Sequence, residues 1–185
     1  MPPENAHMSS GRLATFMVGQ GPKRRASSAK KRGGAALLRW PHAKPSPEEL
    51  AKSGFYYVPS ASSPDNCQCF ACGVMLDGWE PEDIPALEHH AHRTECAWAL
   101  QCYIKHKFDI DEPIDEDPMS EEYVKGREAT FEGWPHEGKR GWKCKVAKMV
   151  EAGWFFDPSP SMEDGVTCAY CQTEIGGWER KDDPM

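Results

Sequence analysis

The apolar residues of this chain fall into short runs that are closed by turn signals. Residues 46–49, Ser-Pro-Glu-Glu, supply an N-cap, a proline at the first helical position and a capping-box glutamate, which predicts a helix that begins at Ser46. Gly54 is suited to end this helix, because glycine adopts the left-handed backbone of a C-terminal cap without strain. The apolar residues 55–58 predict a strand directly after it.

The following segment has the pattern of a hairpin and then a second helix. Residues 66–70 and 74–76 are short runs on either side of Cys72-Gly73, as expected for two strands around a tight turn. Pro85 begins a segment that we predict to be helical through His92.

An internal repeat organises most of the chain. At a constant offset of 99 residues, Cys69-x2-Cys72 matches Cys168-x2-Cys171, and the Gly-Trp-Glu of residues 78–80 matches residues 177–179. Upstream the offset changes: it is 94 residues for the Trp-Pro-His of residues 40–42, and 115 residues for Arg12 with Thr15-Phe16. The difference of 21 residues predicts an insertion in the first copy, at about residues 17–38.

Two stretches are too polar to pack into a core. Residues 23–32 contain six Lys or Arg and no large apolar side chain, which predicts a disordered loop inside the insertion. Such a basic string also serves nuclear import or contact with phosphates. Residues 109–122 contain eight Asp or Glu, which favours a solvated spacer over an acidic interaction tail.

Composition narrows the class of protein. The chain has 185 residues, 39% of them hydrophobic and 28% charged, with a formal net charge of −7. It is too polar for one core, so compact units joined by solvated segments are expected. No apolar run approaches the roughly 18 residues of a membrane span. The apolar segment of a secretion signal is also missing after Met1, which argues against secretion. Eight Cys and seven His then indicate metal sites rather than disulfides.

The first repeat contains a full ligand set for one zinc ion, Cys69-x2-Cys72-x16-His89-x6-Cys96. Three Cys and one His complete a tetrahedral structural site and leave no position open for catalysis. His89 and Cys96 would share one face if a single helix carried both. In the second copy Cys168 and Cys171 are metal-ligand candidates without a matching His and Cys before Met185, which predicts an incomplete site.

The other cysteines do not fit the metal spacing. Cys67 aligns with Val166, an apolar strand position, so we interpret it as a small buried hydrophobic residue. Cys102 and Cys144 are expected to be free thiols.

Taken together, these motifs resemble the baculoviral IAP repeat (BIR). The matching elements are the Arg12-x2-Thr15-Phe16 and Trp40-Pro41 motifs, the helix start at Ser46, the Cys/His spacing and the Gly-Trp-Glu of residues 78–80. The basic insertion and the tandem arrangement are similar to survivin-type BIR proteins of fungi, which belong to the chromosomal passenger complex. On this basis the first BIR domain occupies residues 11–104, an acidic linker 105–125, and a second, C-terminally truncated BIR domain 126–185.

The resemblance implies a fold class and a site. The fold class is α+β: each repeat has a short three-stranded antiparallel sheet, several small helices and one zinc. BIR domains bind peptides with a free amino terminus, usually alanine, which add to the sheet edge. In this chain Leu76 and Trp79 would line the alanine pocket, and Asp77 and Asp83 would bind the ammonium group. These residues, together with Glu82 and His92, are the predicted peptide-binding set.

His92 distinguishes two subfamilies. Survivin-type repeats carry His at this position, near the phosphate of a phosphorylated histone tail, whereas caspase-inhibiting repeats carry Trp. A histidine gains charge easily near neutral pH and so suits a phosphate. The plainer alternatives are that His92 is a solvated helix residue and that the acidic residues are only loop charges. Because Gly176 stands where Asp77 does, the second copy is expected to bind ligand more weakly.

The resemblance therefore implies a non-enzymatic adaptor. Its partners would be a histone tail with a free N-terminal alanine, the inner-centromere scaffold and the mitotic kinase of the passenger complex. No binding to a membrane is expected. Its location would be the nucleus, at centromere, kinetochore and spindle. The alternative is an inhibitor of apoptosis that binds caspases or their antagonists. A third hypothesis, a ubiquitin ligase, would need a further zinc module that is not seen here. A fourth hypothesis is direct DNA contact by the basic loop.

Overall fold

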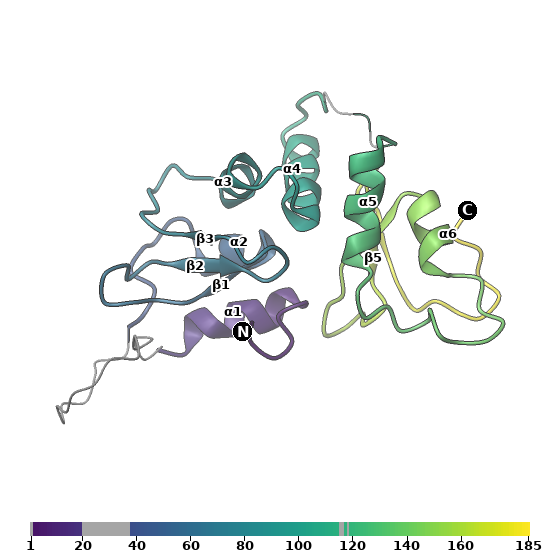
Figure 1. Ribbon diagram of the computed structural model, residues 1–185, viewed down its shortest axis with the longest axis horizontal. Coiled ribbons are helices and arrows are strands. Elements are labelled where there is room, and N and C mark those ends of the chain that lie inside the picture. The colour runs from purple at the N-terminus through teal and green to yellow at the C-terminus, as the bar shows by residue number, and fades with distance from the viewer. Residues whose placement is uncertain (1, 20–37, 115–116, 118) are drawn as a thin grey trace. The chain divides into compact units, whose positions relative to one another are not determined.

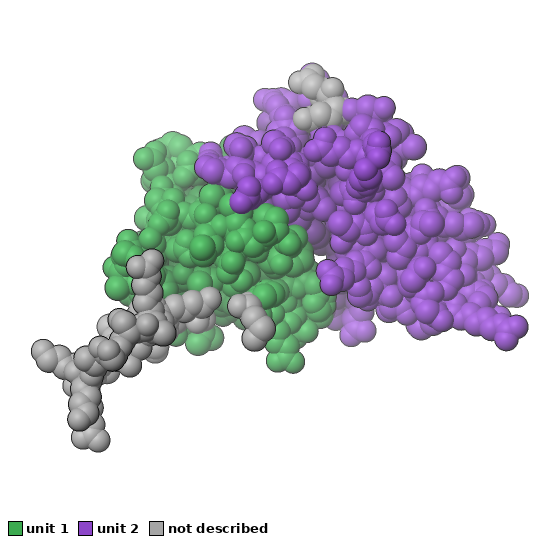
Figure 2. Space-filling view, viewed as in Figure 1, with its two compact units in different colours: residues 1–85 green, residues 86–185 purple. Residues whose placement is uncertain are grey.

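The computed structural model describes residues 2–19, 38–114, 117 and 119–185 (Figure 1). The basic stretch 23–32 and most of the predicted insertion lie outside the described residues. The chain divides into two compact units, residues 1–85 and residues 86–185 (Figure 2). No helix among the described residues is long and apolar enough to cross a membrane.

The first unit is built from two helices and a small sheet. Helix α2 (Pro47–Lys52) begins as predicted: the Ser46 hydroxyl accepts from Glu49 N at 3.2 Å, and the Glu49 carboxylate accepts from Ser46 N at 2.7 Å. The helix ends before Gly54, whose φ of 95° is the left-handed cap. This capping box satisfies two backbone donors that the helix itself leaves open.

The sheet of the first unit is antiparallel, in the order β1-β2-β3. Its strands are β1 (Phe55–Tyr57), β2 (Cys67–Cys69) and β3 (Met75–Leu76). The register pairs Tyr57 with Cys67, and Cys67 with Leu76. The predicted three-stranded sheet is therefore confirmed, and β3 forms one of its edges.

Helix α1 (Ser9–Met17), which the sequence pattern did not predict, packs on this sheet. Arg12 is fully buried and donates to the carbonyl oxygens of Ala51 and Ala6, each at 2.7 Å. Phe16 stacks on Tyr57 with ring centroids 5.5 Å apart. The conserved spacing between Arg12 and Phe16 within the two copies thus serves to fasten a helix to the sheet.

The second unit contains the remaining elements. They are α3 (Pro85–His92, which starts at the unit boundary), α4 (Ala97–Asp109), α5 (Glu121–Thr130), α6 (Val146–Glu151), β4 (Trp154–Phe156), β5 (Val166–Cys168) and β6 (Glu174–Ile175). The predicted helix from Pro85 to His92 is confirmed. The acidic stretch 109–122 is partly helical, because α4 extends to its first residue and α5 begins near its end.

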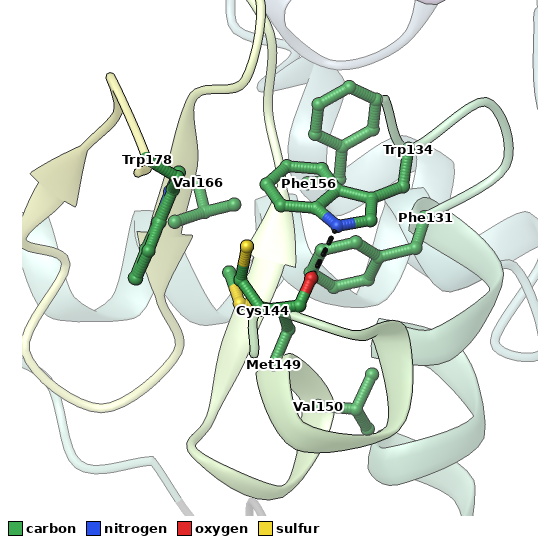
Figure 3. Close-up of a cluster of buried hydrophobic side chains, with 8 residues drawn as sticks. All are labelled: Phe131, Trp134, Cys144, Met149, Val150, Phe156, Val166 and Trp178. Atoms are coloured by element: carbon green, nitrogen blue, oxygen red, sulfur yellow. Dashed lines mark hydrogen bonds between the residues drawn. The ribbon is translucent and has the colours of Figure 1, made fainter. Parts of the chain in front are cut away.

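The second copy rebuilds the packing of the first. Its sheet has the order β4-β5-β6 with Phe156 opposite Val166, and Phe131 stacks on Phe156 at 5.9 Å. Figure 3 shows these side chains in one core, where the Trp134 indole N–H donates to the Cys144 carbonyl oxygen at 2.9 Å. In the first copy the Trp40 indole makes the equivalent bond to Pro45 at 3.1 Å.

The two copies differ in how the helix before the sheet is capped, α2 in the first copy and α6 in the second. Lys145 at the N-cap of α6 offers no side-chain acceptor. Instead, the Glu137 carboxylate accepts from Val146 N at 2.8 Å. Glu137 comes from a loop that is five residues longer than in the first copy, since the offset rises from 94 to 99 there. This longer loop therefore replaces the capping box of the first copy.

Candidate zinc centre and peptide-binding turn

The first cysteine pair lies on a tight turn at the end of β2. The Cys69 sulfur accepts hydrogen bonds from the backbone N–H groups of Ala71 at 3.3 Å and Cys72 at 3.5 Å. Gly73 closes the turn with a φ of 73°. Backbone donors aimed at sulfur favour a thiolate, the form in which cysteine binds a metal.

The second ligand pair comes from two helices rather than one. His89 lies on α3, which ends at His92, and Cys96 is the N-cap residue of α4. The condition for a shared helical face, one helix that carries both residues, is therefore not met. The chain turns between them, because Arg93 N and Cys96 N form short-range bonds to His89 O and Arg93 O that end one helix before the next.

Cys69, Cys72, His89 and Cys96 nevertheless come together. One ligand atom from each lies within 4.8 Å of all the others. Among the described residues they are the one group of three or more Cys, His, Asp or Glu placed to hold a metal. Tetrahedral zinc–thiolate bonds of about 2.3 Å would separate the sulfurs by about 3.8 Å. The soft donor set and its spacing therefore fit zinc.

Cys67 is a buried thiol, as predicted. It is fully shielded from solvent, and its sulfur donates to the Asp65 carbonyl at 3.7 Å. Burial raises the pKa of Cys67 well above its ordinary value, and the Asp65 charge adds to this effect. All eight cysteines are free of disulfides, Cys102 and Cys144 included.

The turn that follows β3 is organised around Asp65. Its carboxylate, 10% exposed, accepts from Trp79 N at 3.0 Å and contacts His42 Nε2 at 3.1 Å. Trp79 is thereby held with its ring edge-on to Phe55, at 5.5 Å between centroids. The Trp79 indole N–H is buried and has no hydrogen-bond partner among the described residues.

Four of the predicted peptide residues lie within four residues of this tryptophan in the chain. Leu76 is half-buried at the end of the edge strand, and Asp77 and Glu82 are exposed. Asp83 also stabilises the turn, which the sequence did not predict: its Oδ2 accepts a hydrogen bond from Glu80 N at 2.8 Å. Its other oxygen is not used in this bond, so Asp83 can both hold the turn and meet a cation.

His92 is the last residue of α3 and its side chain is 54% exposed. Its Nδ1 lies 2.9 Å from the Glu88 carbonyl oxygen and 3.9 Å from the Glu88 carboxylate. Because a carbonyl can only accept, Nδ1 carries the proton in this contact, and Nε2 takes no part in it.

The second copy keeps the framework of the turn but alters its lining. Asp164 accepts from Trp178 N at 2.9 Å and contacts His136 Nε2 at 2.9 Å, as Asp65 does in the first copy. A Cβ atom at Gly176 would overlap the Met162 side chain. The place that Asp77 occupies in the first copy is therefore filled by Met162.

Cys168 repeats the sulfur turn of Cys69. Its sulfur accepts from Tyr170 N at 3.4 Å, and Gln172, with a φ of 57°, takes the position of Gly73. The Cys171 thiol contacts the Thr173 hydroxyl at 3.1 Å. Within the described part of the chain, Cys168 and Cys171 have no third ligand for a metal.

Sequence reasoning overlooked the aspartate–histidine–tryptophan connection. The repeat alignment contains the signal for it, because His42 and Asp65 both have counterparts, His136 and Asp164, although the offset shifts between them. Polar residues that recur with a buried tryptophan indicate a shared hydrogen bond rather than surface charge.

Known proteins resemble this chain over both repeats. The family model described as "BIR: Inhibitor of Apoptosis domain" matches residues 12–100 and 127–185. The chromosomal passenger complex protein bir1 of Schizosaccharomyces pombe is 33% identical over 153 residues, which is 79% of this chain and 15% of that protein. Baculoviral IAP repeat-containing protein 3 of Homo sapiens is 30% identical over 145 residues, 78% of this chain and 22% of that protein.

Further similar proteins match a smaller part of the chain. Baculoviral IAP repeat-containing protein 5 of Mus musculus is 40% identical over 67 residues, 35% of this chain and 48% of that protein. A crystal structure of DIAP1 BIR1 bound to a Grim peptide has a TM-score of 0.39 at 24% identity, and covers 61% of this chain and 99% of the other. The chain thus spans less than a quarter of the length of the fission yeast and human relatives. With two family matches over most of its residues, this chain belongs to the BIR, or inhibitor of apoptosis, domain family.

Proposed function

We propose that this chain is a zinc-stabilised adaptor of the chromosomal passenger complex that reads a histone tail. Cys69, Cys72, His89 and Cys96 would hold one zinc, which supplies folding free energy rather than chemistry. The S. pombe relative, a passenger complex protein, supports this assignment. The scaffold and mitotic kinase of such a complex are the expected partners, at centromere and spindle in the nucleus.

The observation that carries the proposal is the acidic turn beside the open edge of β3. An extended peptide that pairs with β3 would bring its first residue to Leu76 and Trp79. Asp77 and Asp83 lie on the turn that follows, and two carboxylates favour a free ammonium by charge-assisted hydrogen bonds. In the second copy Met162 and Gly176 remove one of these carboxylates, so we assign tail reading to the first repeat.

His92 is the residue we assign to a phosphate on the third residue of the tail. Its exposed ring presents Nε2 while Nδ1 is occupied by Glu88. An inhibitor of apoptosis is the second candidate, since the family model that matches both repeats carries that description. The two functions differ in the peptide they require, a phosphorylated histone tail or an apoptotic-antagonist peptide.

Calorimetry with alanine-initiated histone peptides, free or acetylated and phosphorylated or not, tests the proposal. Acetylation should weaken binding by roughly 30-fold or more, the usual cost of about 2–5 kcal/mol for an unpaired charge. Asp83→Asn should reproduce this loss, because an amide oxygen can still accept from Glu80 N while the charge is gone. Asp182→Asn is the matched control, since Asp182 accepts from Glu179 N at 2.7 Å in the second copy.

His92→Ala should act on the phosphorylated peptide alone. Equal binding of acetylated and free peptide would refute the amino-terminal pocket. If a phosphate changes nothing and an apoptotic-antagonist peptide binds more tightly, the apoptotic function replaces the histone function.

A further inference from the structure

The second repeat carries a basic surface that the peptide-reading function does not use. Residues 136–148 contain five Lys or Arg and one Glu, whereas the corresponding residues 42–49 of the first copy contain one Lys and two Glu. The turn after the conserved tryptophan changes in the same direction, because Arg180 and Lys181 replace Pro81 and Glu82. This surface stands out in a chain whose net charge is −7.

Six exposed side chains make up this surface, which we call the basic face. They are Lys139, Arg140, Lys143, Lys148, Arg180 and Lys181.

Contacts hold the two segments of the basic face together. Arg180 Nε donates to the Gly141 carbonyl at 3.4 Å, and Lys143 forms an ion pair with Asp183 at 3.4 Å. The charges of Lys148 and Lys143 also lower the pKa of Asp183, after the hydrogen bonds from Met185 N and Lys143. The longer loop therefore brings its cations to the 179–183 turn rather than leaving them dispersed.

Three acidic side chains near the basic face already have partners. Glu137 caps α6, Asp182 accepts from Glu179 N, and Asp183 pairs with Lys143. Among the described residues, Lys143 alone of the six side chains of the basic face forms an ion pair. No carboxylate neutralises the other five cations among the described residues, so their charges can attract an anionic partner.

The composition of the face favours nucleic acid over protein. None of the exposed large hydrophobic side chains among the described residues belongs to segments 137–148 or 179–183. Protein interfaces depend on aromatic or aliphatic anchors in a desolvated centre, whereas nucleic-acid interfaces are more polar and far more positive. Trp142, the one large aromatic of the loop, already stacks on His136 at 4.0 Å with the Lys139 ammonium over its ring.

We propose that the basic face of the second repeat binds the phosphate backbone of duplex DNA without reading its sequence. With Trp142 engaged, the face offers charge and not base stacking. Up to five or so phosphate contacts give a slope of about −4 for log affinity against log salt, a fall of roughly 10²–10³-fold between about 50 and 200 mM salt. This contact is separate from the acidic turn of the first repeat and does not depend on it.

The test is fluorescence anisotropy of the full chain with short labelled duplexes of mixed sequence, over a series of salt concentrations. Arg140→Gln with Lys181→Gln should lower the salt slope by about two and weaken binding roughly tenfold. The control Lys105→Gln with Lys125→Gln removes the same charge from side chains that pair with Asp109 and Glu121 outside the face. It should leave most of the affinity in place, and thermal unfolding should show all variants folded.

Lys30→Gln with Lys31→Gln measures what the separate basic stretch contributes. The proposal is overturned if Arg140→Gln with Lys181→Gln binds like the parent chain, or if the Lys105 and Lys125 control loses as much. It is also overturned if a phosphorylated or acidic peptide binds the face and the duplex does not.

Discussion

The Asp65 carboxylate accepts a hydrogen bond from the backbone N–H of Trp79 at 3.0 Å, across fourteen residues of chain. This bond fixes the backbone of the tryptophan in the turn that follows the edge strand β3. Asp164 and Trp178 repeat it at 2.9 Å over the same separation. The turn at which we place the peptide therefore depends on a buried aspartate that is not one of the predicted peptide-binding residues.

Asp65→Ala should destabilise the first repeat by roughly 1.5–3 kcal/mol, because it removes the acceptor of Trp79 N and the partner of His42. Asp77→Ala is the control: this exposed side chain should change stability by no more than about 0.5 kcal/mol. Urea unfolding of both variants measures the difference. Equal stability of the two would show that the Asp65 bonds contribute nothing.

The same bonds predict a pH dependence. Burial alone would raise the pKa of Asp65, but hydrogen bonds from His42 and from the backbone of Gly78 and Trp79 outweigh it, so the pKa is lowered; Asp164 behaves alike. A carboxyl group with a depressed folded pKa stabilises the protein above its unfolded pKa of about 3.9. The contribution of each aspartate should be lost as the pH falls below about 4. In unfolding measured against pH, Asp65→Ala should therefore lose the Asp65 contribution and keep that of Asp164.

Metal binding gives the largest expected effect. Cys96→Ala should unfold the first repeat, because structural zinc contributes folding free energy on the order of 10 kcal/mol in small domains. Cys102→Ala is the matched control, since Cys102 lies on α4 but outside the ligand cluster. Metal analysis of the purified chain should find tightly held zinc in the control and a loss in Cys96→Ala. A chain without zinc that still folds would contradict the assignment.

The sequence was sufficient to predict features that depend on interactions between residues close together in the chain. The capping box at Ser46, the strand pairs and the helix at Pro85 all follow from neighbouring residues. Helix α1 was missed because its sequence lacks a side-chain cap, and it depends on distant partners such as the Ala51 carbonyl. The role of Cys96 as an N-cap was missed because spacing alone cannot tell one helix from two.

The site could be predicted as a set of residues but not as an arrangement. The ligands of the Cys/His cluster are specified by their spacing, and the structure brings them together. The turn-closing bond of Asp83 and the filling of the second pocket by Met162 depend on backbone direction, which no pattern of residue types encodes.

Gly141 is required by both its backbone and its neighbour. Its φ of 79° is unfavourable for other residues, and a Cβ there would overlap the Arg180 guanidinium. Gly141→Ala should cost about 1–2 kcal/mol of stability, of which Arg180→Ala restores only the steric part. Gly138→Ala, with nothing within 4 Å of its Cβ, should be neutral or stabilising by up to about 1 kcal/mol. Thermal unfolding of Gly141→Ala, of Gly141→Ala with Arg180→Ala, and of Gly138→Ala separates the backbone cost from the steric cost.

The last prediction concerns Met162 and Gly176, which together separate the second pocket from the first. Gly176 has no left-handed backbone requirement, so its lack of a side chain serves mainly to make room for Met162, with Asp164 Oδ1 the next nearest atom at 3.1 Å from a Cβ built there. Gly176→Ala should therefore cost about 1 kcal/mol by overpacking, and the cost should shrink towards zero when Met162 is also replaced by alanine. The corresponding position Asp77 is exposed, so Asp77→Ala should be insensitive to Ser63→Ala, the change at the counterpart of Met162. A double-mutant cycle by urea unfolding measures both couplings. Additive losses at Gly176 and Met162 would mean that Met162 does not occupy the pocket in solution, and the assignment of tail reading to the first repeat alone would lose its steric basis.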